Sequence, residues 1–363
     1  MMIAPRFSLR TAFVCAAACA IFASAFAAPA VRVAAPPDGG KSPDAEVDAQ
    51  GAIHLAWLAG DNVWYAKSTD SGRTFGTALR VNSEPGTAHP PNAFRGPDLA
   101  LGKDGQVHVV WYTNAFQRKL PKEQCGVAYA QLNATRDGFT PAQNLNHQPS
   151  DNYSLAADGR GNVAVVWTAG KLFVTASKDD GKTFAPAQAV ADADPCECCA
   201  TRAIFTTDGA LVAAYRDKAK NVRDMYLATS PAGGAAFTRE KLSVASWTLQ
   251  ACPMTGVFLF GKARGSRLLA AWETQGRINF APLEARGNTP PREIEAAPRG
   301  KYPVALAAPD GTMLVAWKEG AQLHWRLFNA SAQPLGEPGS APAGGPERFA
   351  GVVTREGEFV LFP

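Results

Sequence analysis

The chain has 363 residues, with 36 lysines and arginines against 32 aspartates and glutamates, and its formal net charge at neutral pH is +4. This small excess is not gathered into a basic run, so the composition gives no electrostatic basis for binding nucleic acid or an anionic surface. Beyond the N-terminal segment, no stretch has the roughly 18 uninterrupted apolar residues that a membrane-spanning helix requires.

Residues 1–27 have the pattern of a secretory signal peptide. Arg6 and Arg10 supply a positive start, residues 11–26 are apolar, and Ala25-Phe-Ala27 fits the small-residue rule for cleavage. We therefore expect a periplasmic or secreted monomer whose mature part, residues 28–363, forms one domain. Removal of the segment takes away two of the seven cysteines and lowers the formal charge to +2.

A short pattern then recurs every 46 to 56 residues: glycine, a polar or small residue, alternating apolar residues and an aromatic. Each copy follows another apolar run, which predicts a β-hairpin. A hairpin at this period is typical of a propeller, in which one unit buries its apolar faces only against its neighbours. The copies occupy residues 51–57, 105–111, 161–167, 209–215, 265–272 and 311–317, with a truncated seventh at 357–362.

The expected fold class is therefore an all-β propeller, with seven blades favoured and six as the alternative. The seventh unit ends at Pro363 with only two strands. Residues 30–34, from the other end of the chain, can complete that last sheet and remove its free edge.

A second motif, Ser-x-Asp-x-Gly-x-Thr-Phe, occurs at residues 68–75 and 177–184, with degenerate copies at 133–139 and 229–237. We expect its aspartate to accept backbone N–H groups in a tight turn, its glycine to adopt φ > 0, and its phenylalanine to pack between blades. The motif resembles the Asp box, or BNR repeat, of the sialidase superfamily. This resemblance implies a propeller whose Asp boxes lie on outer turns, away from the central channel.

The residues that precede each innermost strand should converge at one mouth of the channel, which is the default site for a ligand. Resemblance to sialidases implies three arginines that grip a carboxylate, a tyrosine nucleophile activated by a glutamate, and an aspartic acid as general acid. Glu273 and Glu347 are the candidate activators. An exo-acting glycoside hydrolase of this kind is our alternative function, and its catalytic residues would be Arg95, Arg202 and Arg348 as the clamp, Tyr302 as the nucleophile and Asp98 as the acid.

Cysteines are the other unusual feature of the predicted mouth. The segment 194–199, Asp-Pro-Cys-Glu-Cys-Cys, and the later Cys252-Pro-Met254 precede the innermost strands of successive units. They resemble an exported subgroup of Asp-box proteins with a Cys-x-Cys-Cys segment and a later Cys-Pro, from which no activity transfers. In that subgroup His-Asp often follows Cys-Pro, whereas here Met254 and Thr255 do.

Three interpretations of these thiols stay open. One is a disulfide that joins Cys252 to one of the other three cysteines. The second is a soft-metal site for Cu(I), or for Zn(II) if His89, the one candidate histidine, joins. The third is a redox-active dithiol. Our leading prediction is a non-catalytic exported propeller that binds a small molecule, a glycan or a metal, and that has a possible protein partner. Its metal-ligating candidates are Cys196, Cys198, Cys199, Cys252 and Met254.

Overall fold

The computed structural model describes Met1 and residues 30–92, 95–232, 234, 236–261, 268–283, 292–345 and 348–363. Apart from Met1, the predicted signal peptide lies outside the described residues. Within them, no helix is both long enough and apolar enough to cross a membrane.

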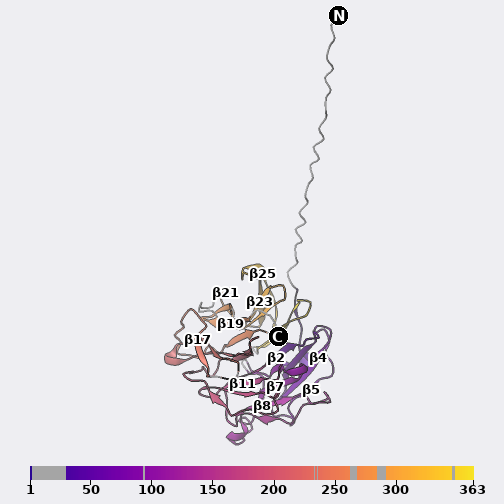
Figure 1. The fold of residues 1–363 in the computed structure, drawn as a ribbon, viewed down its shortest axis with the longest axis vertical. Coiled ribbons are helices and arrows are strands. Elements are labelled where there is room, and N and C mark those ends of the chain that lie inside the picture. The colour runs from indigo at the N-terminus through magenta and orange to yellow at the C-terminus, as the bar shows by residue number, and fades with distance from the viewer. Residues whose placement is uncertain are drawn as a thin grey trace.

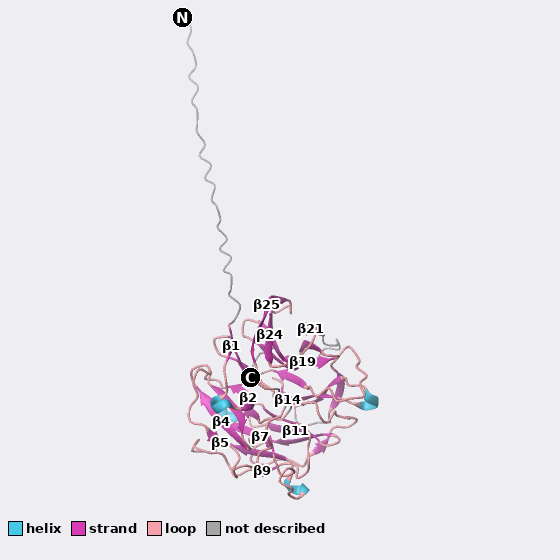
Figure 2. Cartoon of the chain, turned by 180° about the vertical axis from the view of Figure 1, so that it is seen from behind, coloured by secondary structure: helices cyan, strands magenta, loops and turns pink. Residues whose placement is uncertain are grey.

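The described residues form seven small sheets arranged around an axis (Figure 1). Six sheets are antiparallel and four-stranded, and each is a blade in which sequence order equals spatial order from the axis outward. Figure 2 shows the same body from behind, with almost all of its regular structure in strands. The first three blades are β2 (Lys41–Val47), β3 (Ile53–Ala59), β4 (Asn62–Ser68) and β5 (Leu79–Arg80); β6 (Asp98–Leu101), β7 (Val107–Tyr112), β8 (Val127–Gln131) and β9 (Gln143–Asn144); and β10 (Tyr153–Ala157), β11 (Val163–Thr168), β12 (Leu172–Ser177) and β13 (Gln188–Ala189).

The next three blades follow the same order. In the described part of the chain, four short 3-10 turns lie between the strands, at Pro37–Gly39, Lys103–Gly105, Lys122–Gln124 and Ala219–Asn221. The blades are β14 (Arg202–Phe205), β15 (Leu211–Arg216), β16 (Met225–Ser230) and β17 (Thr238–Lys241); β18 (Val257–Phe260), β19 (Leu268–Thr274), β20 (Arg277–Leu283) and β21 (Ile294–Ala297); and β22 (Lys301–Ala307), β23 (Met313–Glu319), β24 (Gln322–Phe328) and β25 (Pro334–Pro342).

The seventh blade is built from both ends of the chain. It contains β26 (Ala350–Val353), β27 (Phe359–Phe362) and β1 (Val31–Val33), and β1 pairs in parallel with β27, with Val31 opposite Phe359. The innermost strands β2, β6, β10, β14, β18, β22 and β26 contact one another in that order, and β26 contacts β2 again. The propeller is therefore closed with seven blades, as predicted, and not with six.

The core consists of apolar clusters between adjacent blades. Side chains of β3 show why: Leu55 and Trp57 pack against the seventh blade, whereas Ala56 and Leu58 pack against the second. Alternate residues of a strand point to opposite faces, and both faces are buried here. No blade can therefore bury its apolar surface alone. The aromatics that end the repeated pattern are all buried, namely Trp57, Trp111, Trp167, Tyr215, Trp272 and Trp317.

The two Asp-box-like turns follow the third strands of the first and third blades. Asp70 accepts the N–H of Thr74 at 2.9 Å, and Gly72 has φ +77°. The ring of Phe75 lies 6.0 Å from that of Phe362 in the seventh blade. Since successive strands are antiparallel, these turns lie on the face opposite to the starts of the innermost strands. They connect blades and take no part in the site described below.

Candidate functional site

The four cysteines of the predicted mouth lie on two loops, which precede β14 and β18 in the adjacent fourth and fifth blades. The first loop carries Cys196, Cys198 and Cys199, and the second carries Cys252. Cys196 donates its N–H to the carbonyl of Arg216 at 2.8 Å, so its loop runs beside the end of β15. The second loop reaches the first at Gly256, where an added Cβ would overlap the backbone of Ala200. The absence of a side chain at Gly256 thus allows the close approach that brings Cys252 to the other cysteines.

Four cysteine sulfurs gather between these loops. The Sγ atom of Cys196 lies 3.3 Å from that of Cys199, 3.7 Å from that of Cys198 and 3.9 Å from that of Cys252. All four sulfurs are within 4.8 Å of one another. Cys198 and Cys252 form a disulfide with their Cα atoms 6.5 Å apart, a separation within the usual range. Cys125 lies apart from this cluster, and its thiol is free and buried.

Burial divides the cluster into an inner and an outer pair. Cys196 and Cys199 are 2% and 0% exposed, whereas Cys198 is half-buried and Cys252 is exposed. Met254, the fifth predicted ligand, is also exposed on the loop that carries Cys252. His89 is not among the residues of the cluster. Its Nδ1 atom lies 2.7 Å from the carbonyl oxygen of Pro90, and its Nε2 atom lies 3.3 Å from the guanidinium of Arg95. Among the described histidines, cysteines and carboxylates, the group that could hold a metal therefore consists of cysteines only.

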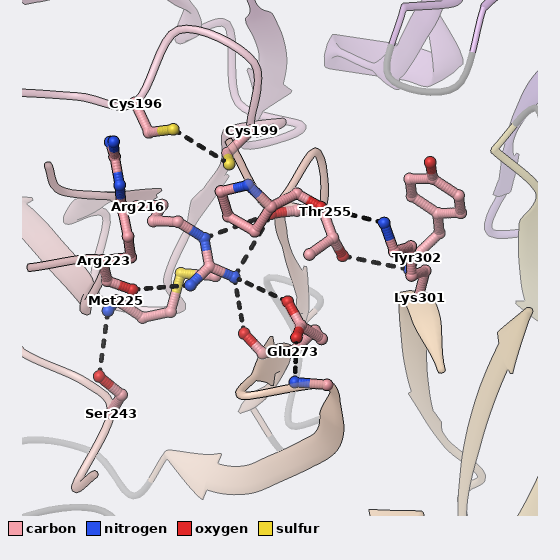
Figure 3. Close-up of polar contacts among 12 residues, drawn as sticks. Cys196, Cys199, Arg216, Arg223, Met225, Ser243, Thr255, Glu273, Lys301 and Tyr302 are labelled. Atoms are coloured by element: carbon pink, nitrogen blue, oxygen red, sulfur yellow. Dashed lines mark hydrogen bonds and ion pairs between the residues drawn. The ribbon is translucent and has the colours of Figure 1, made fainter. Parts of the chain in front are cut away.

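Arg216 lies below Cys196 and Cys199 in the view of Figure 3, and it forms hydrogen bonds both with Cys196 and with Thr255 of the second loop. Its guanidinium is fully buried and donates to the carbonyls of Arg223 at 2.7 Å and Glu273 at 2.6 Å, with a longer bond of 3.4 Å to that of Thr255. The carboxylate of Glu273 lies 3.5 Å from the guanidinium. A planar fork of five N–H donors suits such a position, because it binds carbonyls of three segments at once.

The inner pair of thiols has opposite pKa shifts. A hydrogen bond from the Cys199 thiol lowers the pKa of Cys196 to about 6, with Arg223 and Arg216 acting in the same direction. Burial raises the pKa of Cys199, which remains the proton donor of the pair. The neighbouring S–H group and the two guanidinium groups therefore favour the thiolate form of Cys196.

Two arginines and two aspartates occupy the adjacent centre of the ring. Arg202 contacts Asp44 at 3.2 Å and Asp98 at 3.4 Å, and Arg348 contacts Asp98 at 2.8 Å. These residues come from the fourth, first, second and seventh blades, so the network crosses the axis. A cavity of about 60 Å³ beside it is lined by Arg202 and Arg348, and also by Tyr302.

The predicted catalytic set is only partly assembled. Arg202, Arg348, Asp98 and Tyr302 lie around one centre, but Arg95 donates to the carbonyls of Asp151 at 2.8 Å and Ser150 at 3.0 Å. The guanidinium of Arg95 also lies over the ring of Tyr112. The three arginines therefore do not form one clamp.

The charges around Tyr302 and Asp98 do not match a sialidase-like mechanism. Burial opposes ionisation of Asp98, but Arg348 and Arg202 outweigh it and hold the pKa of Asp98 below its usual value. Such a group is ionised at neutral pH and is no proton donor. Glu273, one candidate activator of Tyr302, contacts Arg216. Glu347, the other candidate activator, lies outside the described residues.

Sequence reasoning missed the role of Arg216. The available signal was a charged residue at a position that the repeated pattern makes interior, directly after the repeat aromatic. The residue after the repeat aromatic is Leu58, Tyr112 or Thr168 in the first three blades. In the next two it is Arg216 and Glu273, which are also buried. A charged side chain at a position that the repeat makes interior requires a partner, and these two residues are partners of each other.

These features define a seven-bladed β-propeller with a tetracysteine cluster on the face where its innermost strands begin. No family model matches the sequence, and no curated protein matches it. A solved structure of a protein of unknown function from Dyadobacter fermentans is 17% identical, with a TM-score of 0.53, over 84% of this chain and 95% of that chain.

Two further solved structures share the fold. A triple mutant of AofleA from Arthrobotrys oligospora is 12% identical, with a TM-score of 0.53, over 84% of this chain and 87% of that one. NanB in complex with Optactamide is 10% identical, with a TM-score of 0.52, over 80% and 67%. Another NanB structure is that of a sialidase from Streptococcus pneumoniae. At these identities the similarity establishes the propeller fold and no activity.

Proposed function

We propose that this is an exported propeller that binds a soft metal ion through Cys196, Cys198, Cys199 and Cys252 in their reduced form. The observation that carries the proposal is the spacing of the sulfurs. With a metal–sulfur distance of about 2.3 Å, the sulfurs of a tetrahedral site are about 3.8 Å apart. The distances from Cys196 to the other three sulfurs are 3.3, 3.7 and 3.9 Å.

The donor set restricts the class of metal. Thiolates favour Cu(I), Zn(II) and iron–sulfur clusters, whereas hard cations prefer oxygen ligands. The group contains no carboxylate or imidazole. We therefore propose Cu(I) as the ion, with Zn(II) as the other ion that four thiolates suit. Met254, exposed beside Cys252, offers a soft thioether to an arriving Cu(I) ion and is not one of the four proposed resident ligands.

The surrounding charge supports a thiolate site. Four thiolates around a monovalent or divalent cation leave a net negative charge, which is unfavourable in a partly buried position. Arg216 and Arg223 both lower the pKa of Cys196, so they favour the anionic form that a metal requires. A carboxylate in their place would have the opposite effect.

The test is a titration of the fully reduced mature protein, without oxygen, with Cu(I) in competition with a chelator of known affinity and separately with Zn(II). We expect one equivalent to bind tightly, and Co(II) to give the visible absorption of a tetrahedral thiolate site. Cys199→Ser should weaken binding by at least tenfold. Cys125→Ser is the matched control, because it removes a buried thiol outside the cluster. Equal affinity in Cys199→Ser and Cys125→Ser would contradict the proposal.

The glycoside hydrolase alternative receives less support. Arg202 and Arg348 already bind the carboxylates of Asp44 and Asp98, so a substrate carboxylate would have to displace them. Arg95 binds backbone carbonyls instead. Absence of hydrolysis of a fluorogenic sialoside by the native protein is the expected result, and hydrolysis that is lost in Tyr302→Phe would restore the alternative.

A further inference from the structure

We infer that the four sulfurs also form an intramolecular disulfide relay, in which a disulfide moves between the outer pair, Cys198 and Cys252, and the inner pair, Cys196 and Cys199. The relay uses the cysteines of the proposed metal site but needs no metal. It is therefore a separate activity, thiol–disulfide exchange, which can be present whether or not the metal proposal is correct.

The position of Cys196 carries this inference. Its sulfur lies 3.7 Å from one sulfur of the Cys198–Cys252 disulfide and 3.9 Å from the other. On its other side lies the sulfur of Cys199, at 3.3 Å. Cys196 and Cys199 are spaced as Cys-x-x-Cys, a motif found in thiol–disulfide oxidoreductases. One buried thiol thus contacts both sulfurs of the disulfide and also its own partner.

The exchange balances without an external oxidant. The Cys196 thiolate attacks the Sγ atom of Cys252, the S–S bond to Cys198 breaks, and the electron pair leaves on the Cys198 sulfur. Cys199 then loses its proton and attacks the Sγ atom of Cys196, which expels Cys252 as a thiolate. The products are a Cys196–Cys199 disulfide and two thiols at Cys198 and Cys252, which take up the protons that Cys196 and Cys199 lost.

Burial gives the relay a direction of access. Cys252 is exposed and Cys198 half-buried, so an external disulfide can reach the outer pair but not the inner one. An external disulfide RSSR would oxidise the outer pair and leave as two RSH molecules, after which the bridge could move inward. The substrate class we infer is therefore a small disulfide, or a disulfide exposed on another exported protein. Each disulfide removes two of the four thiolates, so oxidation of either cysteine pair would also abolish metal binding.

The experiment uses mature protein carrying Cys125→Ser, so that the four cluster cysteines are the only thiols of its described part. The protein is reduced, freed of metal with a chelator, and oxidised with one equivalent of oxidised glutathione. Remaining thiols are alkylated and identified by mass spectrometry. The relay predicts two isomers, one alkylated at Cys196 and Cys199 and the other at Cys198 and Cys252. A single isomer alkylated only at Cys196 and Cys199 would overturn the inference.

A second variant tests the order of the steps. With Cys199→Ser the inner bridge cannot form. The isomer that contains a Cys196–Cys199 disulfide should therefore disappear, and a Cys196–Cys252 disulfide should accumulate. If the variant does not keep the circular dichroism and melting temperature of its parent, Cys199→Ala replaces it. An unchanged Cys198–Cys252 bridge in whichever of these variants folds would contradict the relay. Because chelator is present throughout, this outcome would leave the metal titration of the reduced protein unaffected.

Discussion

Arg202 and Asp44 form an ion pair of 3.2 Å across the axis of the propeller, although 158 residues separate them in the sequence. Arg202 begins β14 in the fourth blade and Asp44 lies near the start of β2 in the first, on the far side of the ring. The pair, extended by Asp98 and Arg348, therefore spans the axis at the face that carries the cysteines. Its charges neutralise one another, which leaves the mouth without the excess positive charge that a carboxylate clamp would need.

We expect Arg202→Met to destabilise the protein strongly. Removing one partner of a buried ion network leaves an uncompensated charge, at a cost of about 3–5 kcal/mol. Urea unfolding measures this loss. Arg277→Met is the control, because Arg277 pairs with Glu295 at the exposed surface and its loss should change the unfolding free energy by about 0–1 kcal/mol. Equal effects of the two variants would show that the network contributes no more than a surface pair.

Arg216→Lys should weaken metal binding as well as folding. Lysine keeps the charge but cannot bind the carbonyls of Arg223, Thr255 and Glu273 together, and each lost hydrogen bond to a charged group is worth about 1.5–3 kcal/mol. The two cysteine loops should then separate, and affinity of the reduced protein for Cu(I) should fall. Calorimetric melting and the chelator competition above report the two effects. A stable variant with undiminished affinity would exclude a positioning role for Arg216.

Gly181→Ala should cost more stability than Gly159→Ala, although both glycines have positive φ. An αL alanine costs roughly 1–2 kcal/mol at either position. At Gly181 the added Cβ would also overlap the hydroxyl of Tyr129 in the neighbouring blade, whereas nothing lies within 4 Å at Gly159. Such overpacking adds about 1–3 kcal/mol. Chemical unfolding of both variants gives the difference between their losses of stability. This difference should vanish if the turn at residues 177–184 does not contact the neighbouring blade.

A free imidazole takes up a proton near pH 6.5. Below about this pH the stability of the folded protein should fall, partly because of His54. Burial lowers the pKa of His54 in the folded protein, although its ring contacts Tyr65 at 2.8 Å and Asp48 at 3.1 Å. Between the two pKa values the unfolded chain binds more protons, so the free energy of unfolding decreases as the pH falls. In His54→Gln this decrease between pH 7.5 and 5.5 should be smaller, by roughly 1 kcal/mol. His147→Gln, at an exposed position, is the control for loss of an imidazole outside the core.

A chain that begins at residue 35 should be less stable than one that begins at residue 30. The shorter chain lacks β1, which covers the edge of β27 and carries the ion pair of Arg32 with Glu358 at 3.0 Å. The shorter chain also loses the hydrogen bonds from Phe359 N–H to the carbonyl of Ala30 and from Ala34 N–H to the carbonyl of Leu361. At about 1 kcal/mol for each of these three contacts, the loss is roughly 3 kcal/mol. Hydrogen exchange at Phe359–Phe362 should rise in the shorter chain. Similar protection in both chains would mean that β1 does not protect the edge of β27.

The repeated glycine-to-aromatic pattern predicted the blades and the place of the closing strand, because strand alternation and hairpin turns depend on residues close together in the chain. The meeting of the cysteines was also predictable, since the innermost strands of neighbouring blades begin on the same face. Which two cysteines form the buried inner pair and which two form the outer pair was not predictable. Whether Cys196 contacts Cys252 depends on how two long loops fold over Arg216.

Sequence by itself therefore determined the propeller and the face on which Cys196, Cys198, Cys199 and Cys252 lie, and it favoured seven units over six. Only the tertiary structure decided that Arg202 and Arg348 bind Asp44 and Asp98 while Arg95 binds backbone carbonyls. The physical reason is that periodic burial is encoded locally, whereas the partner of a charged side chain is set by the rotation of each blade about the axis, which brings residues from opposite ends of the chain within 4 Å of each other.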